Sequence, residues 1–315
     1  MDTQTPEAVV RIKIVGVGGG GTNAVERMLD ANIPMVEYIT INTDDGGYYG
    51  SRADTKLQIG KRETQGRGAG ADPEKGLRSA EENRKEIEEV LRDCDMVFIT
   101  AGMGGGSGTG AAPVVAEIAR KLGILTVAVV TKPFAFEGKK RMDNALVGIS
   151  NLEKYADSMV VIPNENLKKV SQTKITLCNA FEIADSVLVQ TVKNLVELIQ
   201  NTAFINCDFA DIKSVIENSG TMHTATGLAS GIDRGEKILK QITSSVLLDS
   251  SVDDAERILV CITAAEDAGL EEIDGITSVL TGMASPDANI IFGMNIDDTM
   301  EDAMKVVLIA TAKKA

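Results

Sequence analysis

The chain has 315 residues, which is enough for two domains with separate hydrophobic cores. Its 46 acidic residues outnumber its 32 basic residues, giving a formal net charge of −14 that would repel nucleic-acid phosphates. The four cysteines lie far apart in the sequence, which favours reduced thiols over a disulfide framework or a zinc site. A nucleic-acid-binding role and a disulfide-rich secreted fold are therefore both disfavoured.

Neither a secretion signal nor a membrane-spanning segment is expected. The N-terminal sequence MDTQTPEAVVRIKIVG lacks a basic start followed by an apolar run, and no apolar stretch approaches the ~18 residues of a membrane helix. These features predict a cytoplasmic protein without direct membrane insertion. His223 is the only histidine and is expected at the surface or an interface, so acid–base chemistry must depend mainly on carboxylates, lysines or metal-bound water.

The first half of the chain alternates short apolar runs, rich in β-branched residues, with longer helical patterns. Strands are predicted over residues 11–17, 37–42, 96–100, 125–130 and 158–162, and helices over 22–31, 73–94, 110–122 and 139–155. This alternation is typical of an α/β fold with a parallel, Rossmann-like sheet covered by helices on both faces. Ligands of such sheets bind beyond the carboxyl ends of the strands, where the loops gather.

The run over 176–200 is apolar on nearly every side of a helix, which indicates a helix buried between two layers. We interpret it as a long central helix that connects two domains. The predicted units are an N-terminal domain (1–175), the connecting helix (176–200) and a smaller α/β C-terminal domain (201–315). The C-terminal unit mixes helical and strand patterns.

The run from Gly16 to Asn23 combines the end of a strand, a glycine-rich turn and the start of a helix. Glycine lets backbone N–H groups approach a phosphate without a Cβ collision, and a helix N-terminus adds partial positive charge. Gly16, Gly18 and Gly21 also satisfy the GxGxxG pattern of dinucleotide enzymes, and Asp44 follows at the end of the next predicted strand. An NAD-dependent oxidoreductase is one open interpretation, and tight strand–helix packing is another.

A second glycine-rich run, GMGGGSGTG at 102–110, lies between the predicted strand 96–100 and the following helix. So many glycines cost conformational entropy on folding, which favours a specific use over a flexible surface loop. A dinucleotide enzyme needs one such loop, whereas two facing loops suit a triphosphate. Neither run has the lysine of a Walker-type GxxxxGK[ST] loop.

The segment GGGSGTG at 104–110 resembles the signature loop of the tubulin/FtsZ superfamily, and the similarity extends along the whole chain. It is closest to the bacterial FtsZ family. The other matching segments are GVGGGGTNAVERM (16–28), GRGAGADPEKG (66–76), TKPFAFEGKKRM (131–142), NCDFADIKSVI (206–216) and SPDANIIFG (285–293). The resemblance implies that 1–175 is a GTP-binding domain and 201–315 an activation and polymerisation domain.

The resemblance also implies a nucleotide site. The residues expected to cradle the nucleotide and wrap its phosphates are Gly19, Gly20, Gly21, Thr22, Asn23, Gly106, Ser107 and Gly108. Gly70 and Ala71 should approach the terminal phosphate, where Asp72 replaces the family's usual Asn and adds a negative charge. Glu137 and Arg141 should contact ribose and phosphate, because carboxylates accept from hydroxyls and guanidinium groups bind anionic oxygens. A solvated ion pair between these two residues is the alternative.

Asp185, on the predicted central helix, matches the guanine-reading position of the family. A carboxylate there can accept from both N1–H and the exocyclic amine of guanine, whereas adenine offers no such pair of donors. The alternative is that Asp185 faces solvent or makes an internal hydrogen bond. Phe181, one turn earlier, is expected either to stack on the base or to belong to the core.

Two carboxylates, Asp208 and Asp211, are expected on one face at the start of a helix. A central helix of about 25 residues would span roughly 37 Å, so these acids would lie far from their own subunit's nucleotide. They can reach a neighbour's nucleotide only if subunits stack head to tail. The resemblance implies the same arrangement, with Asp208 and Asp211 polarising the attacking water and Asn206 positioning it. A helix cap is the alternative role for one of the acids.

These expectations describe a GTPase that is activated by assembly into head-to-tail homopolymers. Its ligands would be GTP, GDP and Mg²⁺, with the cation held mainly by phosphates and water and not by a protein metal site. The resemblance implies a cytokinetic ring at the bacterial division site, with membrane-anchor and division proteins as partners. A nucleotide-bound structural polymer with weak hydrolysis and a non-division role is the alternative.

Overall fold

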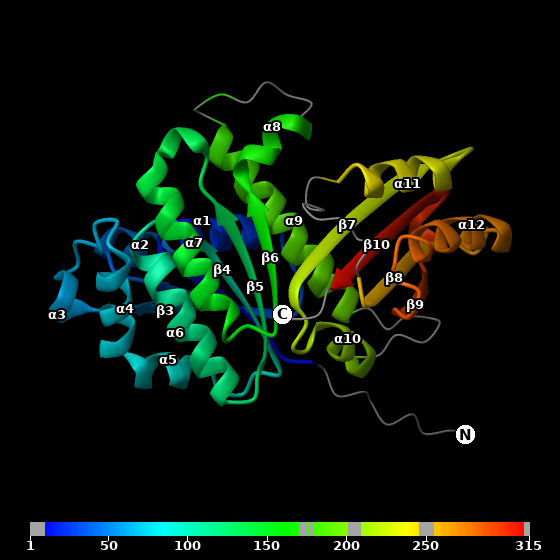
Figure 1. Cartoon of the computed structure of the whole chain (residues 1–315). Helices are drawn as coiled ribbons and strands as arrows, with labels where there is room; N and C mark the ends of the chain where they lie inside the picture. The colour runs from blue at the N-terminus through cyan, green and yellow to red at the C-terminus, as the bar shows by residue number, and fades with distance from the viewer. Residues whose placement is uncertain (1–9, 171–175, 177–178, 201–208, 246–254, 312–315) are drawn as a thin grey trace, which may run out of the picture.

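One mixed ten-stranded sheet runs through the protein, in a computed structural model that describes residues 10–170, 176, 179–200, 209–245 and 255–311. The strand order is β3-β2-β1-β4-β5-β6-β7-β10-β8-β9 (Figure 1). The strands are β1 (Ile12–Val17), β2 (Val36–Asn42), β3 (Thr55–Gln58), β4 (Met96–Gly102), β5 (Leu125–Lys132), β6 (Ser158–Pro163), β7 (Gly220–Ser230), β8 (Arg257–Ala264), β9 (Asn289–Ile296) and β10 (Ala303–Thr311).

The main helices of the N-terminal half are α1 (Gly18–Asp30), α2 (Asp45–Gly50), α3 (Lys61–Thr64), α4 (Pro73–Glu82), α5 (Arg84–Leu91), α6 (Ser107–Lys121), α7 (Lys139–Glu153) and α8 (Leu167–Val170). They are followed by α9 (Ala180–Gln200), α10 (Phe209–Ile216), α11 (Arg234–Thr243) and α12 (Leu270–Thr281). Short 3₁₀ turns occupy Ala135–Glu137, Asn164–Asn166 and Asp298–Met300.

The six strands from β3 to β6 are parallel, and their side chains alternate between two buried faces. On β1, Ile14 belongs to the core cluster under α1 and α9, whereas Val15 belongs to the cluster under α5, α6 and α7 (Figure 1). Burial on both faces explains why these strands read as continuous aliphatic runs. The predicted parallel α/β sheet is confirmed, and each strand predicted in this half is present within two residues of its expected bounds.

The C-terminal half forms a smaller α/β unit. Strand β10 pairs antiparallel with both β7 and β8, while β9 adds parallel to β8. Helices α11 and α12 cover one face and enclose a third core that includes Ile238, Ile276 and Leu308. This unit joins the parallel sheet through two residue pairs between β6 and β7, and α9 packs against both halves.

Helix α9 lies between the two halves, as the sequence predicts. Its buried residues, including Val192 and Leu195, belong to the same core cluster as Leu259 of β8 and Ile309 of β10. Polar contacts add to this packing: Lys305 Nζ lies 2.8 Å from Glu197, and Asn194 donates to Thr226 at 2.8 Å.

Helix α9 is described from Ala180, and the predicted start at residue 176 coincides with its N-terminal cap, because Thr176 O accepts a hydrogen bond from Ala180 N at 2.9 Å. Thr176 and Asn179 hydrogen-bond through their side chains to each other's backbone amides, a capping arrangement that precedes the helix.

Other predicted helix bounds also shift. Helices α1 and α6 begin earlier than expected, at Gly18 and Ser107, because the strand-to-helix turns are tight and the glycines enter the first helical turn. The predicted single helix 73–94 is two helices, α4 and α5. Asn83 ends α4 with φ −116° and ψ 29°, and its side-chain oxygen accepts a hydrogen bond from Gly60 N at 2.8 Å.

Strand β7 was not predicted, because its many small and polar residues give it no regular apolar pattern in the sequence. It lies inside the sheet, with His223 opposite Ala310 of β10. His223 is consequently only 8% exposed, and its predicted surface position is wrong. No helix among the described residues is both long and apolar enough to cross a membrane.

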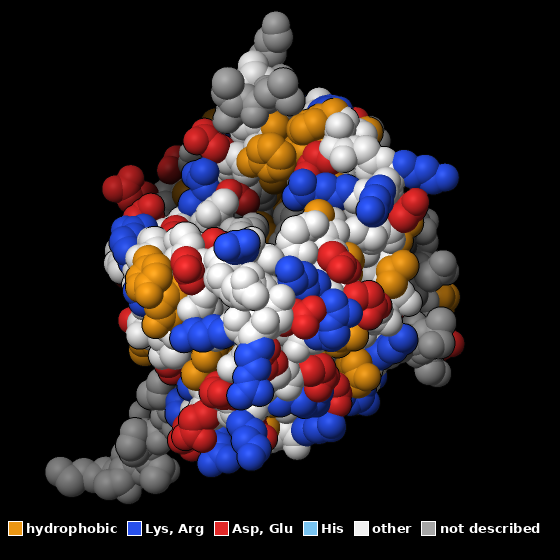
Figure 2. All heavy atoms as spheres, turned by 90° about the vertical axis from the view of Figure 1, so that its left-hand side faces the viewer, with side chains coloured by type: hydrophobic (Ala, Val, Ile, Leu, Met, Phe, Trp, Pro, Cys, Tyr) orange, Lys and Arg blue, Asp and Glu red, His pale blue; other side chains and the backbone are white. Residues whose placement is uncertain are grey.

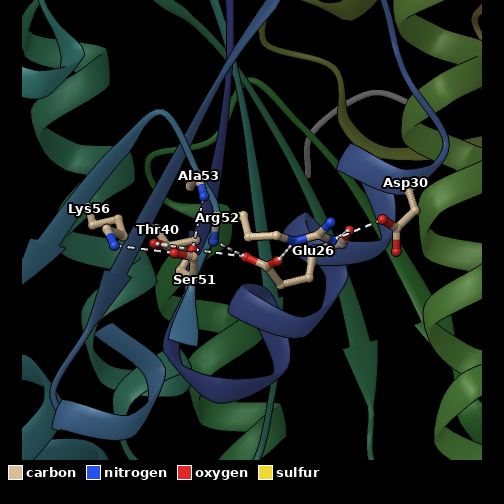
Figure 3. Close-up of polar contacts among 7 residues, drawn as sticks. All are labelled: Glu26, Asp30, Thr40, Ser51, Arg52, Ala53 and Lys56. Atoms are coloured by element: carbon tan, nitrogen blue, oxygen red, sulfur yellow. Dashed lines mark hydrogen bonds and ion pairs between the residues drawn. The ribbon is translucent and has the colours of Figure 1, made fainter. Parts of the chain in front are cut away.

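A polar network fastens α1 to the segment before β3 (Figure 3). Glu26 accepts from Arg52 Nε at 2.7 Å, from Arg52 N at 2.7 Å and from Ser51 Oγ at 3.0 Å. Arg52 also donates to Asp30 at 2.9 Å, and Ser51 accepts from Thr40 Oγ1 at 3.1 Å. The helix that carries the first glycine run is thereby held to two neighbouring strands.

Candidate nucleotide-binding site

The two glycine runs meet at the carboxyl ends of β1 and β4. These strands are adjacent and parallel, with Val17 opposite Ala101, so the turns that follow them lie side by side. Gly18 has φ +71°, and a Cβ atom there would lie 2.6 Å from the backbone nitrogen of Gly108. Glycine is required at this position because the two loops touch through their backbones.

A cavity of about 350 Å³ opens between these loops and the start of α9. Ten residues predicted from the sequence line it: Gly19, Gly20, Asn23, Gly106, Ser107, Gly108, Glu137, Arg141, Phe181 and Asp185. The structure therefore brings together residues from both glycine runs, the α7 region and α9.

The loop end of the cavity suits phosphate. Helices α1 and α6 both begin there, and neither has an acidic residue in its first turn to offset the partial positive charge. No side chain or backbone atom lies within 4 Å of the position of a Cβ atom on Gly19 or Gly105, so their backbones face open space. Backbone N–H groups at two helix starts form an anion-binding surface.

Two predicted residues support the first loop from behind and do not line the cavity. Thr22 is buried and its hydroxyl accepts a hydrogen bond from Asn42 Nδ2 at 3.2 Å. A Cβ atom on Gly21 would lie 2.4 Å from Thr100 O, which leaves no room for a larger residue. The second glycine loop is supported in turn by the segment after β2, since the Thr43 and Ser107 hydroxyls lie 2.5 Å apart.

Gly70 and Ala71 also lie outside the cavity lining, in an exposed turn before α4, with φ +63° and +61°. This turn borders the second glycine loop, because a Cβ atom on Gly106 would lie 2.9 Å from Asp72 N. Asp72 caps α4 by accepting from Glu74 N at 3.0 Å, which gives its carboxylate a structural role. The predicted contact of Gly70 and Ala71 with a terminal phosphate stays a prediction.

Glu137 and Arg141 form an ion pair, with 3.1 Å between Arg141 Nε and Glu137 Oε2. The Glu137 side chain is only 7% exposed and also accepts from Phe134 N at 2.9 Å. Glu137 is therefore held in the wall of the cavity, whereas the Arg141 side chain is 50% exposed, so the pair is partly solvated. Its predicted contacts with ribose and phosphate stay predictions.

The opposite end of the cavity suits a planar base. Phe181, 47% exposed, meets the half-exposed Phe136 edge to face, with 6.3 Å between ring centroids. Phe134 packs below them, 5.8 Å from Phe181. Phe181 therefore belongs to a small aromatic cluster at the cavity and not to the central core.

Asp185 lines this end with its carboxylate tied to α1. Arg27 Nε lies 3.1 Å from Asp185 Oδ2, so the internal hydrogen bond considered from the sequence is present and coexists with a place in the cavity wall. Burial raises the pKa of Asp185, while the charge and hydrogen bond of Arg27 oppose that rise.

Asn164 is a cavity residue that sequence reasoning missed. It is 4% exposed, and its side-chain oxygen has no hydrogen-bond partner among the described residues. A buried unpaired amide oxygen is costly unless a ligand or water satisfies it. Its position directly after β6, at the carboxyl edge of the sheet, is the signal that could have identified it.

The dinucleotide-binding interpretation requires Asp44 to bind the ribose of NAD, and the structure contradicts that role. Asp44 accepts from Gly47 N at 2.8 Å and caps α2, and it is absent from the cavity lining. An acid that bound the ribose of NAD would have to face the cavity.

Of the predicted hydrolytic residues, Asp211 is described by the structure and does not line the cavity. Asn206 and Asp208 lie outside the described residues. Asp211 lies on α10, and the segment after α10 is tied to the amino end of β6 by a 2.9 Å bond from Ser219 N to Asp157 O. Helix α10, which carries Asp211, thus lies near the amino ends of the parallel strands, opposite the glycine loops (Figure 1).

No group of three or more potential metal-binding side chains occurs within the described ranges. The expected Mg²⁺, held by phosphates and water, stays a prediction.

Comparisons with known proteins agree with this geometry. Residues 11–172 match the sequence model of the Tubulin/FtsZ family GTPase domain, and residues 220–314 match that of the FtsZ family C-terminal domain. The structure resembles an FtsZ dimer from M. jannaschii at 42% identity and TM-score 0.89, covering 98% of this chain and 89% of that chain.

The GTPγS-bound protofilament of CetZ2 from Haloferax volcanii has the same fold. Its TM-score is 0.81 at 17% identity, with 97% of this chain and 94% of that chain covered. These sequence models together span most of the chain, and the first of them includes the cavity's lining residues up to Asn164 but not those of α9. The chain therefore belongs to the tubulin/FtsZ family, with the family's GTPase domain followed by an FtsZ-type C-terminal domain.

Proposed function

We propose that this protein binds GTP in the cavity between its glycine loops and hydrolyses it after assembling head to tail with further copies. The single observation that carries this proposal is the separation of Asp211 from the cavity. Helix α9 has 21 residues and so extends about 31 Å, with the cavity at its start and α10 beyond its end.

Successive parts of the cavity would bind the phosphates, the ribose and the base of GTP. Two helix N-termini with exposed backbone amides suit the phosphates, and the Glu137–Arg141 pair suits the ribose and an adjacent phosphate. Phe181 offers a face for the base, while Asp185 can accept from the two donors that distinguish guanine from adenine. Gly70 and Ala71 would close over the terminal phosphate.

Hydrolysis then needs a second subunit. Asp211 and Asp208, with Asn206, would polarise and position the attacking water in the neighbour's cavity, because no movement of one intact subunit carries α10 around the sheet. A head-to-tail contact of this kind does not close on itself and generates a filament. Mg²⁺ bound to the phosphates would offset the charge that develops during transfer.

We infer a role in cell division from the similarity to FtsZ. The protein would form a ring at the division site in the cytoplasm and would require membrane-anchor and division proteins to hold it there. The M. jannaschii FtsZ structure is a dimer and the CetZ2 structure is a protofilament, which supports self-association as the mode of action.

The decisive experiment compares Asp211→Ala with wild type in sedimentation and phosphate-release assays. We expect Asp211→Ala to pellet with GTP as wild type does but to release phosphate at least about 100-fold more slowly. Glu236→Ala, which removes an exposed carboxylate of α11, is the matched control and should behave as wild type.

Wild-type turnover per subunit should also rise steeply above the assembly concentration. Equal turnover by dilute and assembled protein would contradict the proposal. Filaments that form with GTP but hydrolyse it at the same low rate in wild type and Asp211→Ala would favour a structural polymer instead.

A further inference from the structure

The two outer strands of the sheet differ in how they are protected. Strand β3 has four residues, includes Lys56, and lies on a face where acidic and basic side chains are closely mixed (Figure 2). Short, charged edge strands prevent pairing with other chains. Strand β9, at the other edge, has eight residues and none of them is charged. In the part of the chain that the structure describes, no strand pairs with its outer side (Figure 1).

An apolar groove of about 580 Å³ lies between β9 and α12. Ile290 and Phe292 line it from the strand, and Leu270 and Ile273 line it from the helix. Leu270 is 84% exposed and Ile290 is 41% exposed. Large apolar side chains gathered in water in this way mark an interaction site.

An extended segment would use the strand edge and the groove together. Side chains alternate along β9, so Ile290 and Phe292 face α12 while Gly293 and Asn295 face α9. A strand added beside β9 would direct every second side chain toward the groove. Its backbone would pair with the free N–H and C=O groups of β9, the mode of recognition called β-strand addition.

Charge decides which kind of segment fits. Glu271 and Asp274 line the groove, and neither Lys nor Arg is among its lining residues. Asp287 lies just before β9 and Asp298 just after it, both exposed. A partner segment with basic residues at its ends is therefore attracted at both ends of the strand.

A second copy of this chain fits less well. Two β9 strands paired antiparallel about the centre of the strand would place Asp287 of each copy opposite Asp298 of the other. Like charges opposite each other destabilise a strand pair, and both copies carry a net charge of −14.

We propose that β9 and the groove beside α12 dock an extended segment of a partner protein, with apolar residues at alternate positions and Lys or Arg at its ends. This site is separate from the nucleotide cavity and does not depend on the proposed hydrolysis.

The test measures fluorescence anisotropy of a labelled peptide, KKVTITVKK, titrated with the full chain in the absence of nucleotide. We expect saturable binding that weakens as salt is raised, since exposed charge pairs are screened. The peptide EEVTITVEE should bind at least about tenfold more weakly because its ends are repelled. The peptide KKVTPTVKK should lose binding to a similar degree, because proline removes a backbone donor.

Variants locate the site. Ile290→Lys adds positive charge to the groove, and Leu270→Ser removes apolar contact from it. Each variant should weaken KKVTITVKK binding about tenfold or more. Val279→Lys is the matched control: Val279 is exposed on α12 but does not line the groove, so binding should change less than about twofold. Leu270 is nearly fully exposed, so Leu270→Ser tests the site even if Ile290→Lys fails to fold.

Three results would overturn the proposal. These are an absence of binding, equal binding of the basic and acidic peptides, and equal losses in Val279→Lys and Leu270→Ser. A nucleotide-free dimer of wild type in sedimentation that Ile290→Lys dissociates would also overturn it, assigning the strand edge to a second copy.

Discussion

Arg27 Nε lies 3.1 Å from Asp185 Oδ2, so an ion pair joins α1 to α9 at the rim of the nucleotide cavity. Glu182, also on α9, lies 3.8 Å from the same guanidinium group. The Asp185 side chain is 18% exposed, and the arginine supplies the positive charge that a carboxylate in such surroundings requires. The helix that begins at the phosphate loop thus also positions the residue expected to recognise the base.

Arg27→Gln should weaken GTP binding by about tenfold, because the Asp185 carboxylate loses the group that holds its position. It should also raise the pKa of Asp185 further, since Arg27 opposes the effect of burial. Calorimetric titration with GTP across pH measures both effects. Arg92→Gln removes a surface guanidinium far from the cavity and should leave both unchanged. An unaltered affinity and pH profile in Arg27→Gln would contradict the positioning role.

GTP affinity should fall as the pH decreases. The fall should begin at a higher pH than it would if Asp185 had the pKa of an ordinary aspartate. The pKa of Asp185 is raised, so its carboxylate takes up a proton above the usual value of about 3.9 and loses its capacity to accept from guanine. Asp185→Asn should remove this pH dependence along with the preference for guanine over adenine.

The effect of Asp185 on stability has the opposite sign. The folded protein binds this proton more tightly than the unfolded chain, so the contribution of Asp185 to the free energy of unfolding increases as pH falls. Denaturant titrations of wild type and Asp185→Asn at two pH values separate this effect from binding. A pH-independent GTP affinity in wild type would argue against base recognition by a charged Asp185.

Gly19→Ala and Gly21→Ala should fail in different ways. No atom lies within 4 Å of a Cβ placed on Gly19, so Gly19→Ala should keep the free energy of unfolding within about 0.5 kcal/mol but fill space that a phosphate needs. A Cβ on Gly21 would lie 2.4 Å from Thr100 O, so Gly21→Ala should destabilise the fold by about 2 kcal/mol or more. Urea unfolding measures the stability of both variants, and GTP titration measures their nucleotide binding. Undiminished GTP binding by Gly19→Ala would contradict the assignment of the cavity.

Glu26→Gln should destabilise the protein by about 1 kcal/mol at pH 7, after allowance for the partial exposure of Arg52. Burial would raise the pKa of Glu26, but hydrogen bonds from Arg52 and Ser51 hold it below its usual range. The stabilisation is therefore present above the unfolded pKa of about 4.3 and is lost as pH falls through the folded pKa. The difference in urea midpoint between wild type and Glu26→Gln should shrink below pH 4.

Asp72→Asn should strengthen GTP binding without loss of stability. Asparagine can cap α4 as aspartate does, while the negative charge beside the second glycine loop is removed. Asp72→Ala is the control for the cap and should cost about 1 kcal/mol in the free energy of unfolding. Weaker GTP binding by Asp72→Asn would show that the charge assists the ligand or its cation.

Much of the fold could be predicted because it depends on local patterns. The aliphatic runs of β1, β4 and β5 indicate strands buried on both faces, and the glycine runs after β1 and β4 indicate strand-to-helix turns. Strand β7 and the break at Asn83 could not be predicted in the same way. The first depends on neighbours from distant parts of the chain, and the second on one hydrogen bond from Gly60.

The candidate site also combines residues that could be predicted from the sequence with residues that could not. Ten of its lining residues follow from motifs, whereas Asn164 and the Arg27–Asp185 pair were not expected. Arg27 and Asp185 are 158 positions apart, and their contact exists only because α1 and α9 pack on the same face of the sheet.

The sequence by itself indicated the parallel sheet and the two glycine-rich turns, because periodicity and backbone sterics act over a few neighbouring residues. Its resemblance to known sequences indicated the family. Only the tertiary structure decided that the runs face one cavity, that α10 lies at the opposite end of the parallel strands, and that the outer side of the uncharged strand β9 has no partner strand among the described residues. These features depend on how segments far apart in the chain pack together, and no local pattern specifies that packing.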